Sequence, residues 1–162
     1  MSETRLKYYG YVDRPYEAVR NLLRSRADEV FQRATNTAGE SVKGLLARLR
    51  VEAAGIEVGI DVRIEVAKRP DDESAGGLSP VTHVALSWKA AERAALFPSM
   101  SADLSLSPMT FSETRVEFEG VYKPPFGAVG RLLDTVVGHR VAEAAVQRFV
   151  NDVIEQISRE LP

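Results

Sequence analysis

The chain has 162 residues, of which 44% are hydrophobic and 27% are charged, with a formal net charge of -2 at pH 7. This length and composition predict a single globular domain spanning 1–162, and the balanced charge argues against a basic face for nucleic acid or anionic lipid. With no cysteine and two histidines, the chain cannot form a disulfide framework and lacks the usual ligands of a zinc site. We therefore expect neither a metal nor a cofactor.

The first 35 residues predict a strand and then a helix. Residues 5–12 (RLKYYGYV) alternate between two faces, and Tyr8 falls on the face away from the charged side chains. Pro15 starts the helix, because proline is tolerated at the first helical position. Apolar residues at helical spacing extend this amphipathic helix, broken at most once, to about Thr35.

Five further stretches alternate with the period of a strand. Residues 45–53 and 56–66 predict a hairpin that turns at Ala54 and Gly55, and a loop at 69–80 separates it from three more strands. From Ile56 onward the apolar side chains occupy even-numbered positions, so we expect them to form one inward face, with the carboxylates outside. The strand residues chosen as pocket lining are Ile60, Ile64, Leu86, Trp88, Met100, Leu104, Phe118 and Tyr122.

The last segment predicts a long amphipathic helix from about Phe126 to Leu161, with Leu133 and Val136 on its apolar stripe. It follows the stretch YKPPFGAVGRLLD, which we interpret as a joint in which two prolines end the strand and set the angle of the helix. A phosphate-binding loop would need a longer glycine pattern ending in Lys-Ser or Lys-Thr, and that ending is absent.

The order of strand, helix, five strands and long helix, with the ending GVYKPPFGAVGRLLDTVVGHRVAEAAVQRFVNDVIEQI, resembles the START-like, helix-grip superfamily. This superfamily is also called SRPBCC and includes polyketide cyclase/dehydrase-like proteins. The resemblance covers nearly the whole chain, and its most specific part is the passage Y-x-P-P-x-G-x-x-G-x-x-x-D. It implies an α+β fold in which a curved antiparallel sheet of about six strands wraps around the C-terminal helix. It also implies an apolar tunnel between sheet and helix for lipids, sterols, polyketides or similar ligands.

The inward face mixes large side chains with small ones such as Gly10, Ala102 and Gly120, which favours unfilled space. We therefore predict binding, transport or sensing of a small hydrophobic ligand, lined by the strand residues above together with Tyr8, Leu133 and Val136. No catalytic residue is assigned, because the inward face supplies almost no acid, base or nucleophile.

Two other functions stay open. One is a polyketide cyclase-like enzyme in which Tyr8, Tyr122 or His139 orients a polyketide carbonyl, and the other is a protein-interaction module with a filled core. The amino-terminal residues MSETRLKYY lack the features of a signal peptide, and no segment is apolar enough to cross a membrane, so we expect a cytoplasmic protein. The sequence fixes neither the ligand nor whether the protein forms a homodimer.

Overall fold

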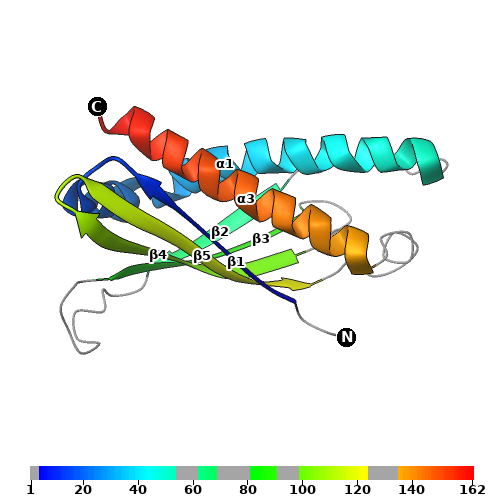
Figure 1. Cartoon of the computed structure of the whole chain (residues 1–162), viewed down its shortest axis with the longest axis horizontal. Coiled ribbons are helices and arrows are strands. Elements are labelled where there is room, and N and C mark those ends of the chain that lie inside the picture. Colours follow the sequence, from blue (N-terminus) through cyan, green and yellow to red (C-terminus); the bar gives the residue numbers. More distant parts are fainter. Residues whose placement is uncertain (1–3, 54–61, 69–80, 91–98, 124–134) are drawn as a thin grey trace.

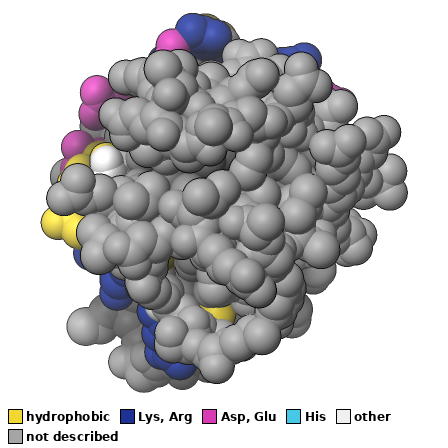
Figure 2. Space-filling view, turned by 90° about the vertical axis from the view of Figure 1, so that its right-hand side faces the viewer, with side chains coloured by type: hydrophobic (Ala, Val, Ile, Leu, Met, Phe, Trp, Pro, Cys, Tyr) yellow, Lys and Arg dark blue, Asp and Glu magenta, His cyan; other side chains and the backbone are white. Residues whose placement is uncertain are grey.

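The computed structural model describes the backbone of residues 4–53, 62–68, 81–90, 99–123 and 135–162, and the side chains of 5–34, 66, 81–87, 100–121, 143 and 146–162. Its elements are β1 (Thr4–Val12), α1 (Tyr16–Ala53), β2 (Val62–Lys68), β3 (Thr82–Ala90), β4 (Ser99–Thr110), β5 (Glu113–Lys123) and α3 (Thr135–Glu160). Figure 1 shows α1 and α3 on the same side of the sheet. Figure 2 views the molecule from the right-hand side of Figure 1, where described side chains come into view mainly at the margins.

The described strands form one antiparallel sheet with the order β1-β5-β4-β3-β2. Pairing between β1 and β5 is continuous, whereas the β4–β5 pairing shifts register between Pro108 and Thr110. A sheet with helices on one face is an α+β arrangement, which confirms the predicted fold class.

One predicted strand is wrong. Residues 45–53 belong to α1, which continues past Thr35 to Ala53, so the described sheet has five strands where about six were expected. The segment is rich in leucine, alanine, arginine and glutamate, all good helix formers, and Leu45, Leu46 and Leu49 also fit helical spacing. The predicted turn and residues 56–61 of the predicted hairpin lie outside the described residues.

Even-numbered positions of the strands face the helices, as predicted. Val84, Leu86, Leu104 and Phe118 are each 4% exposed or less. The register aligns Val84, Leu104 and Phe118 with Tyr8 in one row across four strands, so these residues share a face. This row is part of the concave wall of the core.

Odd-numbered positions carry the charges on the opposite face, also as predicted. Glu117 forms ion pairs with Lys7 at 3.1 Å and with Arg115 at 2.7 Å. His83 Nδ1 lies 2.6 Å from Asp103 Oδ2, with both side chains about one third exposed. Such pairs on a solvated sheet face contribute little to stability.

The two helices close the concave side of the sheet. α3 packs against β1 and β5, α1 packs against β2, and the helices pack against each other. Helix α1 begins directly after Pro15, and Glu17 lies in its first turn, where a carboxylate meets the positive end of the helix dipole. The buried stripe of α3 consists of Val146, Phe149, Val150, Val153 and Ile157. Residues 126–134, predicted as the start of this helix, lie outside the described residues.

Gly10 allows α3 to approach β1 closely. A Cβ atom at this position would lie 2.6 Å from Cδ1 of Ile154, well inside the contact distance of two carbon atoms. A side chain at position 10 would therefore force the end of the Ile154 side chain to move, so glycine lets Ile154 pack directly on β1.

Candidate functional site

Four of the residues predicted to line a pocket are buried on the concave face: Leu86, Met100, Leu104 and Phe118. Tyr8 is half-buried in β1, and its hydroxyl donates to Asn151 Oδ1 of α3 at 3.3 Å. Its ring therefore lies at the margin where β1 meets α3.

The remaining predicted residues are placed by backbone register alone or not at all. Ile64, Trp88, Met100 and Tyr122 occupy one row across β2, β3, β4 and β5, so these positions belong to the concave face. Val136 is the second residue of α3. The other two members of the predicted set, Ile60 and Leu133, lie outside the described residues.

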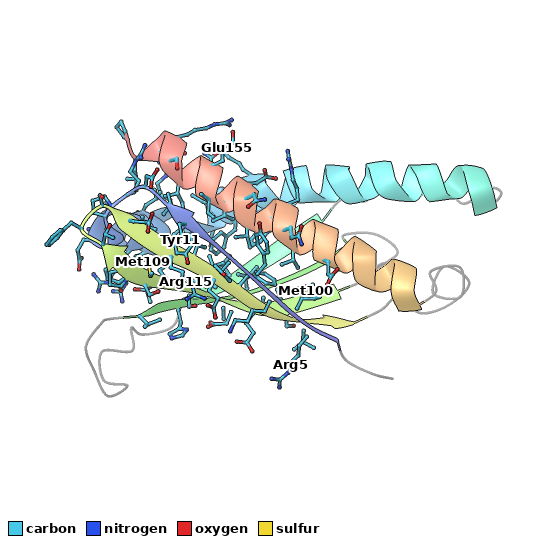
Figure 3. All side chains as sticks on the ribbon, viewed as in Figure 1. Arg5, Tyr11, Met100, Met109, Arg115 and Glu155 are labelled. Carbon is cyan, nitrogen blue, oxygen red and sulfur yellow. The ribbon has the colours of Figure 1, made fainter. Side chains whose placement is uncertain are left out.

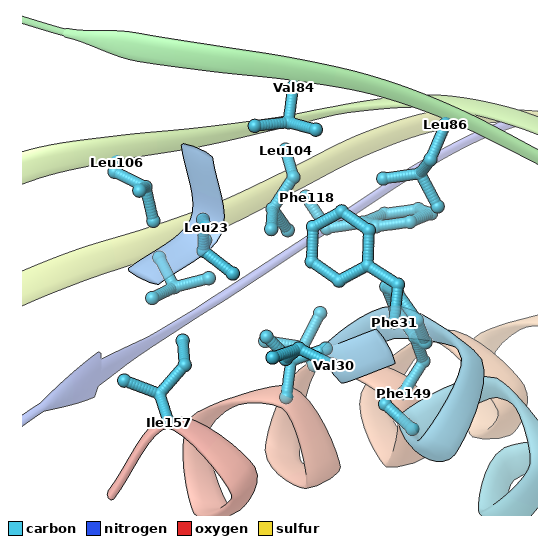
Figure 4. Close-up of a cluster of buried hydrophobic side chains, with 14 of the residues drawn as sticks. Leu23, Val30, Phe31, Val84, Leu86, Leu104, Leu106, Phe118, Phe149 and Ile157 are labelled. Atoms are coloured by element: carbon cyan, nitrogen blue, oxygen red, sulfur yellow. The ribbon is translucent and has the colours of Figure 1, made fainter. Parts of the chain in front are cut away.

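Three phenylalanine rings pack together in one part of the space between sheet and helices. Phe149 of α3 lies edge-on to Phe31 of α1 and to Phe118 of β5, with ring centroids 5.9 Å apart in each pair, and all three rings are fully buried. Figure 4 shows the cluster with neighbours that include Leu86 and Leu104. The sequence places Phe31 and Phe149 on apolar helical stripes, but helical periodicity does not show that the two rings meet Phe118.

Small residues on the concave face do not leave the space that their size suggests. A Cβ atom at Gly120 would lie 2.7 Å from Cε1 of Phe118 and 3.0 Å from Sδ of Met100. At Gly10 the corresponding space is taken by Ile154. At both positions larger neighbours fill the gap, so any ligand space must lie elsewhere along the wall.

The two threonine hydroxyl groups described in the interior of the concave face already have partners. Tyr16 and Thr82 share a buried hydrogen bond of 2.5 Å, and Thr114 Oγ1 donates to the carbonyl oxygen of Arg14 at 2.8 Å. Thr82 and Thr114 were candidate handles for a ligand hydroxyl or carbonyl. Both are instead engaged within the protein, as expected for buried polar groups.

Arg14 also connects the start of the chain to the end of α3. Its Nη2 donates to the carbonyl oxygen of Ser158 at 3.0 Å, and its Nε donates to that of Leu161. These carbonyls lie at the C-terminal end of the helix, where they lack helical donors and where a cation is favoured by the dipole.

Described side chains line two surface grooves. One, of about 220 Å³, lies between α1 and α3 and is lined by Arg33, Ala34, Arg148, Asp152, Glu155, Gln156 and Arg159. The other, of about 170 Å³, lies between β1 and α3 and is lined by Arg5, Leu6, Lys7, Tyr8, Glu143, Val146 and Gln147. Both are mainly polar and therefore differ from the apolar tunnel that the family resemblance implies.

Two carboxyl groups on α3 have shifted pKa values. Burial raises the pKa of Asp152, and Arg148, whose Nε lies 3.2 Å from Oδ2, offsets this rise only in part. The hydrogen bond from Gln156 and the charge of Arg26 lower the pKa of Glu160. Neither carboxyl group faces the concave wall of the sheet, because Asp152 lines the groove between the helices and Glu160 accepts hydrogen bonds from Arg26 Nη1.

The acidic and basic side chains that the structure describes in the strands lie on the convex face, as the parity of the sequence predicts. Figure 3 shows Arg5 and Arg115 on the side of the sheet away from the helices, whereas Met100 points inward. Within the described residues, no group of three histidine or acidic side chains could hold a metal ion. No described helix is long and apolar enough to span a membrane.

Comparisons with known proteins support the fold. No protein-family model and no curated protein matches the sequence. A solved structure of a conserved protein from Geobacillus kaustophilus matches with a TM-score of 0.51 at 9% identity, and 97% of each chain is covered. The chain has the helix-grip, START-like fold.

Other solved structures match the helix-grip chain over most of its length. The Zhui aromatase/cyclase from Streptomyces sp. R1128 is 13% identical with a TM-score of 0.47, covering 99% of this chain and 97% of that one. Norcoclaurine synthase from Thalictrum flavum is 7% identical with a TM-score of 0.45, covering 99% and 90%. Similarity at this level concerns the fold, and a helix-grip fold does not by itself define a function.

Proposed function

We propose that the protein binds a small hydrophobic molecule between the concave face of the sheet and α3, in order to carry or sense it. The chemistry of the concave face carries this proposal. The described side chains in the strand interiors of this face are apolar, apart from Tyr8, Thr82 and Thr114, whose hydroxyls already have partners in the protein. Such a wall offers burial of apolar surface and little polar recognition, which suits a hydrophobic ligand.

The aromatic cluster suggests which part of the wall is available. Phe149 and its two aromatic partners, Phe31 and Phe118, fill the core over the row that contains Leu104. Two further rows extend the concave face beyond Phe118, and they contain Leu86 and Met100. In our proposal, Leu104 and Phe118 form the floor of the site and Tyr8 its rim. The walls are Ile60, Ile64, Leu86, Trp88, Met100, Tyr122, Leu133 and Val136.

Native mass spectrometry of protein purified from its own host tests the proposal directly. We expect a retained molecule of lipid-like mass, and saturable binding of the fluorescent fatty acid cis-parinaric acid to protein from which that molecule has been extracted. The absence of both a retained molecule and saturable probe binding would contradict the proposal.

Two matched variants test the location of the site. Met100 and Leu106 are both buried in β4, 3% and 0% exposed, but they lie at different ends of the concave face. Both Met100→Ala and Leu106→Ala should lower the free energy of unfolding by about 2–5 kcal/mol. Only Met100→Ala should also change the affinity for cis-parinaric acid. Equal affinities for the two variants would argue against a site beside Met100.

The cyclase-like alternative stays a prediction from the sequence. Of Tyr8, Tyr122 and His139, only Tyr8 has a described side chain, and its hydroxyl donates to Asn151. An assay of ring formation with a linear polyketide thioester would separate the two functions, because a carrier binds such a chain without changing it.

A further inference from the structure

We propose that the protein forms a homodimer in which β1 pairs with β1 of a second copy in antiparallel orientation. β1 lies at the edge of the described sheet, with β5 on one side and no described strand on the other. All nine of its residues pair with β5 in unbroken register. A long edge strand without a bulge presents a row of backbone donors and acceptors that a second strand can pair with.

The outer face of β1 has a composition that complements itself. Its first half carries the exposed cations Arg5 and Lys7, and its second half carries Tyr9 and Tyr11, which are 49% and 44% exposed. When β1 pairs with itself about a two-fold axis at Tyr8, Arg5 lies opposite the partner's Tyr11 and Lys7 lies opposite the partner's Tyr9. Each pair brings a cation to an aromatic ring, which is an attractive arrangement.

One of the two tyrosine rings, that of Tyr9, already meets a cation within one copy. The guanidinium of Arg115 lies 4.4 Å from the centroid of the Tyr9 ring, and Tyr11 lies edge-on to Tyr9 at 5.9 Å. Figure 3 shows Tyr11 and Arg115 at the same end of the sheet. This aromatic end is where the cationic end of a partner strand would arrive.

Neighbouring registers are less favourable. Pairing centred on Lys7 would place two lysines directly opposite each other, and like charges in that position are destabilising. Pairing centred on Tyr9 would leave Thr4 and Arg5 without strand partners. Only the register centred on Tyr8 uses the whole of β1.

The groove between β1 and α3 leaves room on the inner side of the edge. It has a volume of about 170 Å³, and Leu6 and Tyr8 line it from the strand while Glu143 and Gln147 line it from the helix. Even-numbered side chains of the partner strand would lie on this side of the joined sheet. The groove can therefore receive them.

Sedimentation equilibrium of the wild type and two variants at Tyr11 tests the proposal. Tyr11→Lys places a cation opposite the partner's Arg5, whereas Tyr11→Glu places an anion there, and both remove the same exposed ring. Because each change acts twice in a dimer, we expect Tyr11→Lys to weaken dimerisation about tenfold or more. Tyr11→Glu should dimerise at least tenfold more tightly than Tyr11→Lys. A wild type that is monomeric at about 100 µM, or equal dissociation constants for the two variants, would overturn the proposal.

Single-cysteine variants test the register, because the chain has no cysteine of its own. Tyr8→Cys puts two thiols opposite each other at the axis, at a Cα separation that a disulfide can bridge, and mild oxidation should give a covalent dimer. The two copies of Tyr11→Cys would be about 20 Å apart and should not crosslink. If Tyr8→Cys does not fold, a double variant with Lys7→Cys and Tyr9→Cys makes the same test across directly opposite positions. Crosslinking of Tyr11→Cys alone would overturn the register.

Discussion

Replacement of Phe149 by alanine tests whether the aromatic cluster fills the core. The Phe149 ring is fully buried and meets both Phe31 and Phe118 at 5.9 Å. Removing such a ring costs about 3–5 kcal/mol, which is the lost transfer free energy plus the cavity left behind. A domain of ordinary stability has only about 5–15 kcal/mol in total, so Phe149→Ala should remove about a fifth of it or more. At about 2–4 °C per kcal/mol for a chain of this size, Tm should fall by roughly 6–20 °C.

Urea unfolding followed by circular dichroism measures this loss, with the slope m expected to stay unchanged if the fold is retained. Phe111→Ala is the matched control. The Phe111 side chain is fully exposed at the β4–β5 turn, so the same substitution there should change stability by less than about 0.5 kcal/mol. A loss below about 1 kcal/mol for Phe149→Ala would refute the reasoning, because removing a ring from a filled core lowers the free energy of unfolding by more than that.

Three further variants probe the C-terminal helix. Arg14→Met removes the charged donors at the C-terminal end of α3, which should lower the free energy of unfolding by about 1.5–3 kcal/mol and speed amide exchange in the last turn of the helix. Unchanged exchange would count against the contact. The pKa of Glu160 is lowered, chiefly by Gln156, so its carboxylate stabilises the fold above the unfolded pKa and loses that effect as pH falls through the folded value. Glu160→Gln should therefore be less stable than wild type near neutral pH and equal to it in acid, as thermal unfolding at several pH values would show; a pH-independent difference would contradict this. Burial raises the pKa of Asp152 beyond what Arg148 offsets, so ionisation of this carboxyl group costs stability as pH rises through its folded pKa. Asp152→Asn should therefore unfold at a higher temperature than wild type at pH 7, but not at a pH below the unfolded pKa. A lower Tm of the variant at pH 7 would contradict this.

The sequence predicts the sheet well because a strand with one buried face must alternate. The inward parity of Val84, Leu86, Leu104 and Phe118 is confirmed, and so is the outward position of Glu117. The parity of β1 could also be predicted, although its inward face contains a tyrosine and a glycine. If a strand shifted its pairing by one residue, all of its apolar side chains would move to the solvent face. The free-energy cost of that exposure keeps the alternation in the sequence regular.

The error at residues 45–53 arises because two periods overlap over a short stretch. Leu45, Leu49 and Ala53 are spaced by four, and they also fall on alternate positions. Over so few residues the hydrophobic pattern cannot separate helix from strand. The intrinsic preference of leucine, alanine and arginine for helix was the better guide here.

The candidate site was harder to predict than the fold, because whether the space beside a small residue is filled depends on how neighbouring side chains pack. Composition suggests open space at Gly10 and Gly120, but Ile154 of α3 occupies it at Gly10, and Phe118 and Met100 occupy it at Gly120. Sequence spacing assigns each side chain to a face and gives no information on how far a neighbour extends into the gap. For the same reason the meeting of Phe149 with the sheet could not be predicted from its helix alone.

The position of β1 in the sheet has a consequence for the order in which the protein folds. β5 meets β4 through a short turn, but it meets β1 across a long separation, as in the pairing of Tyr8 with Phe118, 110 positions apart. Contacts between distant segments form slowly, because the entropy of closing the loop is lost before the contact is gained. We therefore expect the β4–β5 hairpin to form early and β1 to dock late, leaving β5 as a temporary open edge. Pulse-labelling hydrogen exchange during refolding would show this as earlier protection of β4 than of β1, and simultaneous protection would refute it.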